Sequence, residues 1–575
     1  MKFALNDALK FEKRALLVLR TALAAAVSAS LVAVAGCAAI PMSGTVRLGS
    51  DISSVSTNDF LYFSPYEPPA GGSLSDIMAG FLSAGTGPQS DYAVARMYLA
   101  NNLKTSWMPN QRVVIADTTP EVTVDSANNL AHVQVHATAQ IDEGGRLTKI
   151  AAVSNNTYDY SFTREGGQWR INGAPNLTII SRPVFDVVFK DFSLYFFDSQ
   201  KRYLVPDVRW FPSRASTATR LVNALIAGPD SWLLGAAKNA LPAGTKLAID
   251  AVTITDGVAS VDFNTKVLSA STLTKAQIQA QLFATLSQIP GVRSVQISVD
   301  RNIQDFGSFS PWDIPVLSLT PVVLTNSSLA HLSGNSTTAI DGTKTLVQHL
   351  KPKDFAITSQ NNWVAATTKE GLYQASLVSF GAEPTLVDNR TDLLAPLFDR
   401  QGWLWSISAG MSPKILLFDQ NGNKGELQTS VFAKKQILSF SVSPEGARLA
   451  VVIRTGKTNE AWLFGLIRDK SGAAVSISGG YRLATSANNP TSVSWLDGST
   501  LGVLSTNFDG WAEPSELLLG GFETTLAGLN GGTSFIGSHS TDARFALTSS
   551  GELLQFRGSA WTHVQSGVLR VHYPN

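Results

Sequence analysis

The chain of 575 residues contains a single cysteine, Cys37. One thiol excludes a disulfide framework and any zinc or iron–sulfur site built from several cysteines. Charge is also scarce: 15% of the residues are charged, and 45 basic against 44 acidic residues leave a formal charge of +1. Without a basic excess the chain lacks the attraction on which nucleic-acid binding depends, so we predict no nucleic-acid partner.

Catalytic signatures are missing as well. The sequence holds no phosphate-binding loop, no GxSxG nucleophile elbow and no HExxH motif. His132 and His136 would share one face of a helix, but they lie in an alternating stretch that reads as a strand. On a strand this spacing separates them by roughly 13 Å, so we interpret them as solvated side chains rather than metal ligands.

Acidic residues give no better site. Asp256 belongs to a predicted turn and Asp262 closes a predicted strand, so both are assigned structural roles. Residues 419–423 imitate part of a calcium loop, but Gly422 is misplaced and Ser430 stands where the bidentate glutamate should be. An Asn-Gly hairpin turn explains this segment better. We therefore predict no enzyme, no metal and no cofactor.

What the chain does have begins at the N-terminus. Basic residues precede an apolar stretch, 21–35, of about fifteen residues, which is signal-peptide length and short of the roughly 20 that span a bilayer. It ends in Val34-Ala35-Gly36-Cys37, which looks like a lipobox. We predict a lipoprotein signal peptide over 1–36, cleaved between Gly36 and Cys37. The alternatives are a plain cleaved signal or a short signal anchor.

Lipid on Cys37 would anchor the protein to the cell membrane on its extracytoplasmic face. Two acyl chains such as palmitate, at ~0.8 kcal/mol per buried methylene, anchor stably where one chain is marginal. Residues 37–62 then read as a tether, because they are rich in Ser, Thr and Gly and show no hydrophobic periodicity.

The 44% hydrophobic content supports large cores, and the length suggests three or four domains. The first, 63–183, is predicted as an α+β domain with helices capped by Ser75 and Ser90. Alternating strands follow, such as Ala131–Ala137 and the segment ending in Trp169-Arg170-Ile171. Helices followed by strands suggest a cystatin-like or nuclear-transport-factor-like fold.

The second domain, 191–305, is predicted as β-β-α-β-β-α-β. Strands are expected at Ser193–Phe197 and Tyr203–Pro206, with a helix stopped by Gly228. Asp256-Gly257 predicts a hairpin turn, and Thr274 with Gln277 predicts a capping box before the last helix.

The sequence of this domain resembles that of the GerMN domain of exported bacterial proteins. The matching segments, in order, are Tyr195-Phe196-Phe197, Leu204-Val205-Pro206, Leu225-Ile226-Ala227-Gly228-Pro229, Leu241-Pro242-Ala243-Gly244-Thr245 and Asp256–Phe263. Each is ordinary turn and core chemistry by itself, and their shared order carries the resemblance.

The third domain, 315–575, is predicted to be all-β. Hydrophobic bursts recur every 39 to 52 residues: Trp363–Ala366, Trp403–Ser406, Leu449–Val452, Leu501–Leu504 and Phe545–Thr548. A period near 45 with about four strands per repeat is typical of propeller blades, here six, or five or seven. The alternative is a pair of irregular β-sandwiches. Most tryptophans of this region are expected in blade cores, and a few at loop positions could line a binding surface.

Taken together, the lipobox, the two α+β domains and the propeller resemble the LpqB family of actinobacterial lipoproteins. Cys37 with Ile40-Pro41 and Ser43-Gly44 belongs to this resemblance. The family implies an accessory factor outside the plasma membrane that associates with the sensor domain of the MtrB histidine kinase and tunes MtrA–MtrB two-component signalling. It implies no catalytic residue; only Cys37 transfers as a functional position. An envelope glycan- or peptide-binding module is the alternative function, and an enzyme is a third.

Overall fold

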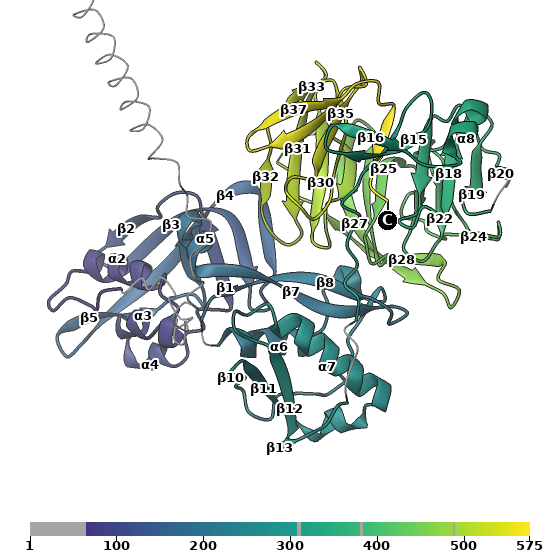
Figure 1. The fold of residues 1–575 in the computed structure, drawn as a ribbon. Coiled ribbons are helices and arrows are strands. Elements are labelled where there is room, and N and C mark those ends of the chain that lie inside the picture. The colour runs from purple at the N-terminus through teal and green to yellow at the C-terminus, as the bar shows by residue number, and fades with distance from the viewer. Residues whose placement is uncertain (1–64, 215, 308–311, 380–382, 487–488, 575) are drawn as a thin grey trace, which may run out of the picture. The chain divides into compact units, whose positions relative to one another are not determined.

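The computed structural model describes residues 65–574 except 215, 308–311, 380–382 and 487–488 (Figure 1). They belong to one compact unit, Asp59–Asn575. The predicted signal peptide, its predicted cleavage site, the predicted lipidation site Cys37 and the predicted tether lie outside the described residues. Within the described segments, no helix has both the length and the apolar character to cross a membrane.

The N-terminal part has helices first and strands afterwards. The helices are α2 (Leu74–Ala84), η2 (Gln89–Asp91), α3 (Ala93–Met97) and α4 (Asn101–Lys104). The strands are β1 (Arg112–Ala116), β2 (Glu121–Asp125), β3 (Leu130–Asp142), β4 (Leu147–Glu165), β5 (Gln168–Gly173) and β6 (Thr178–Ser181), in the order β5-β4-β3-β1-β6 with β2 beside β3. The buried side of α2, with Ile77 and Phe81, packs with Val133 and Val135 of the sheet.

Both predicted helix caps of this part are wrong. The N-cap of α2 is Ser73, whose hydroxyl accepts from the Asp76 N–H while the Asp76 carboxylate accepts from the Ser73 N–H. Ser90, with φ of 46°, lies in η2 and caps nothing; α3 starts after Tyr92. A serine near the start of a helix does not by itself identify the N-cap, because the helix begins at the residue whose side chain forms the capping hydrogen bonds.

The middle part contains two small sheets and two long helices. In chain order its elements are α5 (Arg182–Val188), β7 (Phe189–Asp198), β8 (Leu204–Pro212), α6 (Thr217–Ala227), η3 (Ser231–Leu233), β9 (Ala237–Lys238), β10 (Thr253–Thr255), β11 (Val258–Phe263), η4 (Thr265–Ser269), α7 (Thr272–Leu286), β12 (Ser294–Val299) and β13 (Asn302–Ile303). The sheets run β8-β7-β9 and β10-β11-β12-β13. One core holds Leu221 and Leu225 of α6, Ile278 and Leu282 of α7, and Phe196 of β7.

The turn prediction for this part is confirmed and its cap prediction is wrong. Asp256 and Gly257 have φ of 50° and 81° and join β10 to β11. Positive φ at both central residues is the conformation of the tight hairpin turns that Asp-Gly favours. The N-cap of α7 is Ser271, which accepts from the Thr274 N–H, so Thr274 lies inside the first turn.

The C-terminal part consists of six sheets among the described residues, plus one helix, α8 (Thr343–Leu350). The first sheet contains β14 (Val322–Leu324), β15 (Leu329–Ser333), β16 (Ser336–Ala339) and β38 (Arg570–His572). The second contains β17 (Asp354–Ile357), β18 (Trp363–Thr367), β19 (Leu372–Ser376) and β20 (Thr385–Asp388). The third contains β21 (Leu397–Phe398), β22 (Leu404–Ile407), β23 (Ile415–Phe418) and β24 (Lys424–Glu426).

The fourth sheet contains β25 (Gln436–Val442), β26 (Arg448–Thr455), β27 (Thr458–Arg468) and β28 (Ala474–Arg482). The fifth contains β29 (Pro490–Trp495), β30 (Thr500–Thr506), β31 (Trp511–Leu518) and β32 (Glu523–Thr525), with β33 (Leu529–Asn530) beside β31. The sixth contains β34 (Gly532–Gly537), β35 (Arg544–Thr548), β36 (Leu553–Arg557) and β37 (Ala560–Gln565).

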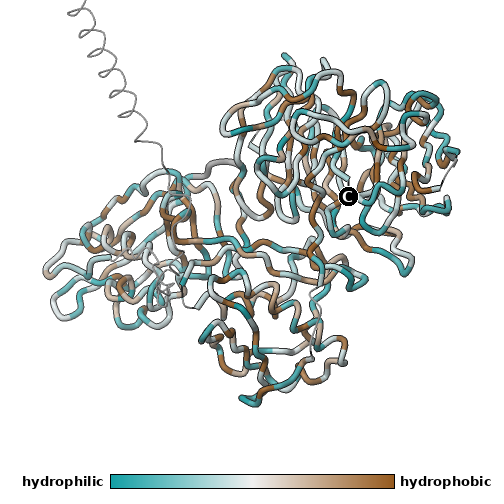
Figure 2. The backbone as a smooth tube through the Cα atoms, in the orientation of Figure 1, coloured by the Kyte–Doolittle hydropathy of each residue, from teal (hydrophilic) through white to brown (hydrophobic). Residues whose placement is uncertain are grey.

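Neighbouring sheets share apolar cores. Figure 2 shows the brown, hydrophobic stretches of the chain in this part. The core of the sixth sheet, with Phe545, also takes in Val323 of the first sheet. The first sheet is completed by β38, whose Val571 pairs with Val323 of β14. The two ends of this part therefore meet in one sheet, as in β-propellers whose last strand completes the first blade.

The recurring hydrophobic bursts correspond to one position in the repeat. They fall on β18, β22, β26, β30 and β35, the second strand of the second to sixth sheets. Each of these strands is hydrogen-bonded on both sides and buried between two neighbouring sheets, so the bursts within them are mostly apolar. The equivalent strand of the first sheet, β14, is only Val322–Leu324 and was not recognised from the sequence.

Candidate functional site

A cavity of about 600 Å³ lies where the first strands of the sheets converge. Its wall comes from β25, β29, β34 and β38, with the start of β17 and the segment 394–397 before and at β21. We call it the central cavity. Its size is within the range of small-molecule sites, which makes it the first candidate for a ligand site.

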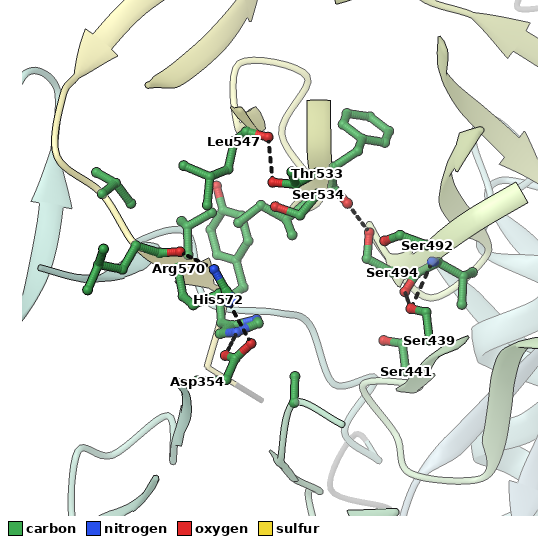
Figure 3. A pocket seen from close by; sticks show the side chains of 18 of the residues that line it. Asp354, Ser439, Ser441, Ser492, Ser494, Thr533, Ser534, Leu547, Arg570 and His572 are labelled. Carbon is green, nitrogen blue, oxygen red and sulfur yellow. Dashed lines mark hydrogen bonds and ion pairs between the residues drawn. The ribbon is translucent and has the colours of Figure 1, made fainter. Parts of the chain in front are cut away.

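Hydroxyl groups from β25, β29 and β34 form one side of the central cavity (Figure 3). Several of them join neighbouring strands. Ser439 Oγ accepts from the Val493 N–H at 3.1 Å, and Ser494 Oγ donates to the Phe535 carbonyl at 2.8 Å. These serines satisfy backbone groups at the open edges of the first strands, so they have a structural role.

Two hydroxyls of this wall are not used in this way. Ser534 Oγ is buried and has no hydrogen-bond partner. Ser492 also lines the cavity, and no described group forms a hydrogen bond with its hydroxyl. A buried hydroxyl without a partner in a native fold calls for an explanation. In this conformation the Ser534 oxygen is also closed off from the cavity, so a water or ligand contacts it only when the side chain turns.

Across the central cavity from Ser439 and Ser494 lies a charged cluster (Figure 3). Asp354 opens β17, and its carboxylate accepts from His572 Nε2 at 2.6 Å and from Arg570 Nε at 3.0 Å, both on β38. Burial alone would raise the pKa of Asp354, but His572 and Arg570 outweigh burial and hold this pKa below its ordinary value. The cluster therefore ties the terminal strand to the second sheet.

The two ends of the cavity differ. Ser439 and Ser441 of β25 bond Val493 and Trp495 of β29 in ascending order, so these strands run in the same direction. Leu317 packs with Val493 and Trp495, and its carbonyl accepts from Ser538 Oγ just beyond β34. Leu317 therefore lies at the end of the cavity where these strands end, whereas Asp354 lies where β17 begins.

A second feature is an exposed aromatic surface on the fifth and sixth sheets. Phe508, in the turn between β30 and β31, is 106% exposed, and Trp511 is 44% exposed. Trp511 lies against Gly528, and Trp561 Nε1 donates to the Ala527 carbonyl at 2.6 Å. The two indoles therefore flank the loop at 527–528. We call Phe508, Trp511 and Trp561 the aromatic ridge.

This ridge bears on the prediction for the tryptophans. Trp403, Trp405 and Trp495 are buried, as expected of blade cores. Trp511 is the exposed one among the tryptophans of this part, and it starts a strand beside a hairpin turn. Trp511 is thus exposed at the start of a strand rather than in a loop, and whether it lines a binding surface stays a prediction.

The histidine pair does not form a site. His132 and His136 lie on β3, and each is bonded to its own carboxylate: His132 Nδ1 to Asp159 at 2.7 Å and His136 Nδ1 to Asp117 at 2.6 Å. Among the described residues, no group of three or more potential metal ligands gathers anywhere. The strand prediction for both histidines is confirmed.

The acidic candidates have structural roles. Asp262 accepts from Ser298 Oγ at 2.8 Å and from the Arg301 N–H at 3.0 Å, which supports the turn between β12 and β13. Asp419 accepts from the N–H groups of Asn421 and Asn423, both at 2.8 Å, inside the turn between β23 and β24. The hairpin interpretation of residues 419–423 is confirmed.

Sequence reasoning missed the charged cluster of the central cavity. Asp354 lies 216 residues from Arg570 and 218 from His572. No local motif links them, and the pairing of β38 with β14 brings them together. The one sequence signal for this cluster is weak: Arg570 and His572 are two residues apart, so they lie on the same face of a short C-terminal strand.

Comparison with known proteins supports this organisation. Family models match in the order LpqB N-terminal domain (67–186), the Germane domain of sporulation and spore germination (193–304) and the LpqB beta-propeller domain (327–574). A solved structure of the tandem GerMN domains of GerM from Bacillus subtilis is 19% identical over 27% of this chain and 62% of that chain, with a TM-score of 0.19.

Curated relatives match over most of the chain. Lipoprotein LpqB of Cutibacterium acnes is 25% identical over 96% of this chain and 99% of its own length. Lipoprotein LpqB of Streptomyces coelicolor is 26% identical over 74% of this chain and 75% of its own length. With the three domain matches in one order and relatives aligned along most of their length, the chain belongs to the LpqB family of lipoproteins.

Proposed function

We propose that this protein is a lipid-anchored accessory factor on the extracytoplasmic face of the cell membrane, without catalytic activity. It is cleaved after Gly36, acylated on Cys37 and tethered by 37–62. Its body consists of an N-terminal α+β domain of cystatin or nuclear-transport-factor type (63–183), a GerMN-like domain (191–305) and a closed six-bladed propeller (315–575). Through this body it binds the sensor domain of an MtrB-type histidine kinase and modulates two-component signalling.

The observation that carries the binding role is the aromatic ridge. A fully exposed phenylalanine three residues before a half-exposed indole costs solvation free energy in an isolated protein, and large exposed apolar surface usually marks an interface. Trp and other aromatic side chains also dominate the energetic centres of protein interfaces. The choice of a sensor kinase as the partner rests on membership of the LpqB family.

Contacts between the parts support presentation of the ridge on a defined surface. Trp210 of β8 donates through Nε1 to the Gly520 carbonyl of the fifth sheet at 2.6 Å. Phe522, two residues on, packs edge-on to Phe185 of α5 at 5.4 Å between ring centroids. The sheet that carries the ridge is therefore held to the rest of the body through partly buried aromatic contacts.

Modulation needs more than binding. A bound factor shifts the equilibrium between two signalling states of a kinase only if it binds one of them more tightly. The lipid anchor would add to this by confining the body near the membrane, where the effective concentration of receptor ectodomains is high.

Cross-linking in intact cells tests the docking surface. Cells would carry the wild type, the double variant Phe508→Ala/Trp511→Ala, or Val378→Ala. Val378, in the bend that follows β19 of the second sheet, is 74% exposed, so it is a control for loss of exposed apolar surface. We expect the kinase among partners captured by the wild type and the control, and at least tenfold less with the double variant, as for loss of a 1.4 kcal/mol contact. Failure to capture a kinase with the wild type would refute the proposal.

The anchor has its own test. Cys37→Ala should prevent acylation, release the protein from the membrane fraction and remove its effect on the two-component response. A released Cys37→Ala protein with full signalling activity would show that tethering is dispensable.

The exposed indole also favours a second candidate, a binding module for envelope glycan or peptide. Sugar rings present apolar faces that stack on indole and phenyl rings. Retention on purified peptidoglycan, lost in Phe508→Ala/Trp511→Ala and kept in Val378→Ala, would favour this function if no kinase is captured.

A further inference from the structure

We propose that the central cavity is a binding site for a small polyhydroxyl ligand of the size of a hexose or hexuronic acid. The site is separate from the aromatic ridge, and it does not depend on which macromolecule the ridge binds. Its recognition chemistry comes from the hydroxyls of β29 and β34 on one side and from β38 on the other.

The polar groups left over in the cavity match such a ligand. Ser492 has no bonding partner among the described residues. Ser534 Oγ also has none, and it becomes available to a ligand when its side chain turns toward the cavity. Hydroxyls donate and accept, which suits a ligand whose own groups do both. Serine side chains fixed on strands also hold these groups at constant positions, as a small-molecule site requires.

The charged side of the cavity adds a directional contact. Arg570 bonds Asp354 through Nε and the Leu569 carbonyl through Nη1 at 2.6 Å, while its side chain remains 48% exposed. Among the described residues Nη2 has no partner, so it is available to a ligand oxygen. His572 uses Nε2 on Asp354, which leaves Nδ1 for the same purpose.

The charge balance argues for a polyhydroxyl ligand rather than a simple inorganic anion. Asp354 contributes one negative charge beside the Arg570 guanidinium, at 3.0 Å, so the two largely cancel. Among the described residues, no lysine and no second arginine lines the cavity. The site therefore offers hydrogen bonds of fixed direction but little net positive charge, whereas anion sites such as phosphate sites combine converging donors with positive charge.

Apolar surface completes the match. Phe440 and Tyr573 line the cavity and are partly buried in neighbouring cores. Ligand pockets combine such rings with a few placed polar groups. Leu317 adds apolar surface at one end of the cavity, and Asp354 and Arg570 stand at the other.

The test uses the full-length protein, purified in a detergent without a sugar headgroup, and isothermal titration calorimetry. The probes are D-glucose, D-glucuronate and inorganic phosphate. We expect saturable binding of at least one of the two sugars with a Kd of ~1 mM or tighter. Ser492→Ala and Ser534→Ala should each weaken it by about 2- to 10-fold, the effect of losing one hydrogen bond.

A matched control is present in the same domain. Ser515 Oγ is likewise buried without a partner, but it lies on β31, outside the cavity lining. Ser515→Ala should leave the sugar affinity unchanged. Ser492 is a partly exposed position, so its variant stays informative even if Ser534→Ala perturbs folding.

Three results would overturn the proposal: no saturable binding of either sugar up to ~10 mM, binding of phosphate alone, or sugar affinity unchanged in both Ser492→Ala and Ser534→Ala. Loss of sugar binding in Phe508→Ala/Trp511→Ala with no loss in the cavity variants would place the ligand on the aromatic ridge and also refute it. The kinase cross-linking result is independent, because it is read with the ridge variants.

Discussion

Arg448 and Glu445 form a buried ion pair where the propeller meets the GerMN-like domain. Arg448 Nε and Nη2 bond the two carboxylate oxygens of Glu445 at 2.7 and 2.9 Å, and the two side chains are 0% and 2% exposed. Nη2 also donates to the Gly498 carbonyl at 2.6 Å. Gly498 lies against Pro206 of β8, so this pair supports the contact between the two domains.

Arg448→Met should lower the free energy of unfolding by about 3–5 kcal/mol, because it leaves the Glu445 carboxylate buried without its partner. The methionine retains much of the apolar volume over Trp495, whose ring lies 4.4 Å from the guanidinium carbon. Most of the loss is therefore electrostatic, and removing the second charge should recover part of it. The double variant Arg448→Met/Glu445→Leu is expected to be more stable than Arg448→Met alone.

Urea unfolding followed by tryptophan fluorescence measures these changes, since Trp495 reports directly on the site. Glu460→Leu is a control, because Glu460 pairs with the exposed Arg482 and should contribute below about 1 kcal/mol. A double variant as unstable as Arg448→Met, or a single-variant loss under about 1 kcal/mol, would refute the reasoning that an unpaired buried charge dominates the cost.

Three further predictions concern single positions. Gly371→Ala should destabilise the second sheet by at least about 2 kcal/mol in thermal or urea unfolding, because φ is +140° and an added Cβ would collide with the Asp388 carbonyl; Gly410→Ala, with nothing near its Cβ, is the control. Ser73→Ala should cost about 1 kcal/mol by removing the cap of α2, whereas Ser75→Ala, at the position predicted from sequence, should cost little. The pKa of Asp354 is held below its ordinary value, so its ionised form stabilises the fold at pH above the unfolded pKa of about 3.9, and this contribution is lost as pH falls through the lower folded pKa. Asp354→Asn should therefore be less stable at neutral pH, and its free energy of unfolding should depend less on pH in the acid range. An acid profile identical to that of the wild type would contradict the assignment.

The elements recognised best from sequence are those whose pattern is set by burial on both sides. Leu449–Val452 is fully apolar because β26 lies between β25 and β27 and faces neighbouring sheets above and below. The hairpin turn at Asp256-Gly257 could also be predicted from sequence, because it depends on two adjacent residues. Helix caps could not be predicted as well, because Ser73, Ser75, Ser90 and Ser271 are alike in sequence and differ only in which hydrogen bonds they form.

The central cavity escaped sequence reasoning for a physical reason. The first strand of each sheet turns its unpaired edge, not a face, toward the cavity. Serines alternate with apolar residues on these strands and form hydrogen bonds with backbone groups of the neighbouring sheet, as Ser439 does with the Val493 N–H. In the sequence, a polar residue that forms hydrogen bonds with backbone groups cannot be distinguished from one that faces solvent on a strand. Only the meeting of β25, β29 and β34 distinguishes Ser439, which is bonded, from Ser534, which is not.

The cluster of Asp354, Arg570 and His572 also connects the cavity with completion of the fold. Arg570 and His572 lie on β38, the strand that completes the first sheet from the far end of the chain. The donors available to a ligand are therefore positioned only after β38 has paired with β14. A ligand that bonds Arg570 would favour the paired state of β38 and so stabilise the propeller by mass action. Sugar binding and protection of the β38 amides from hydrogen exchange should accordingly rise together with ligand concentration, whereas a ligand bound elsewhere in the protein would not protect this strand selectively.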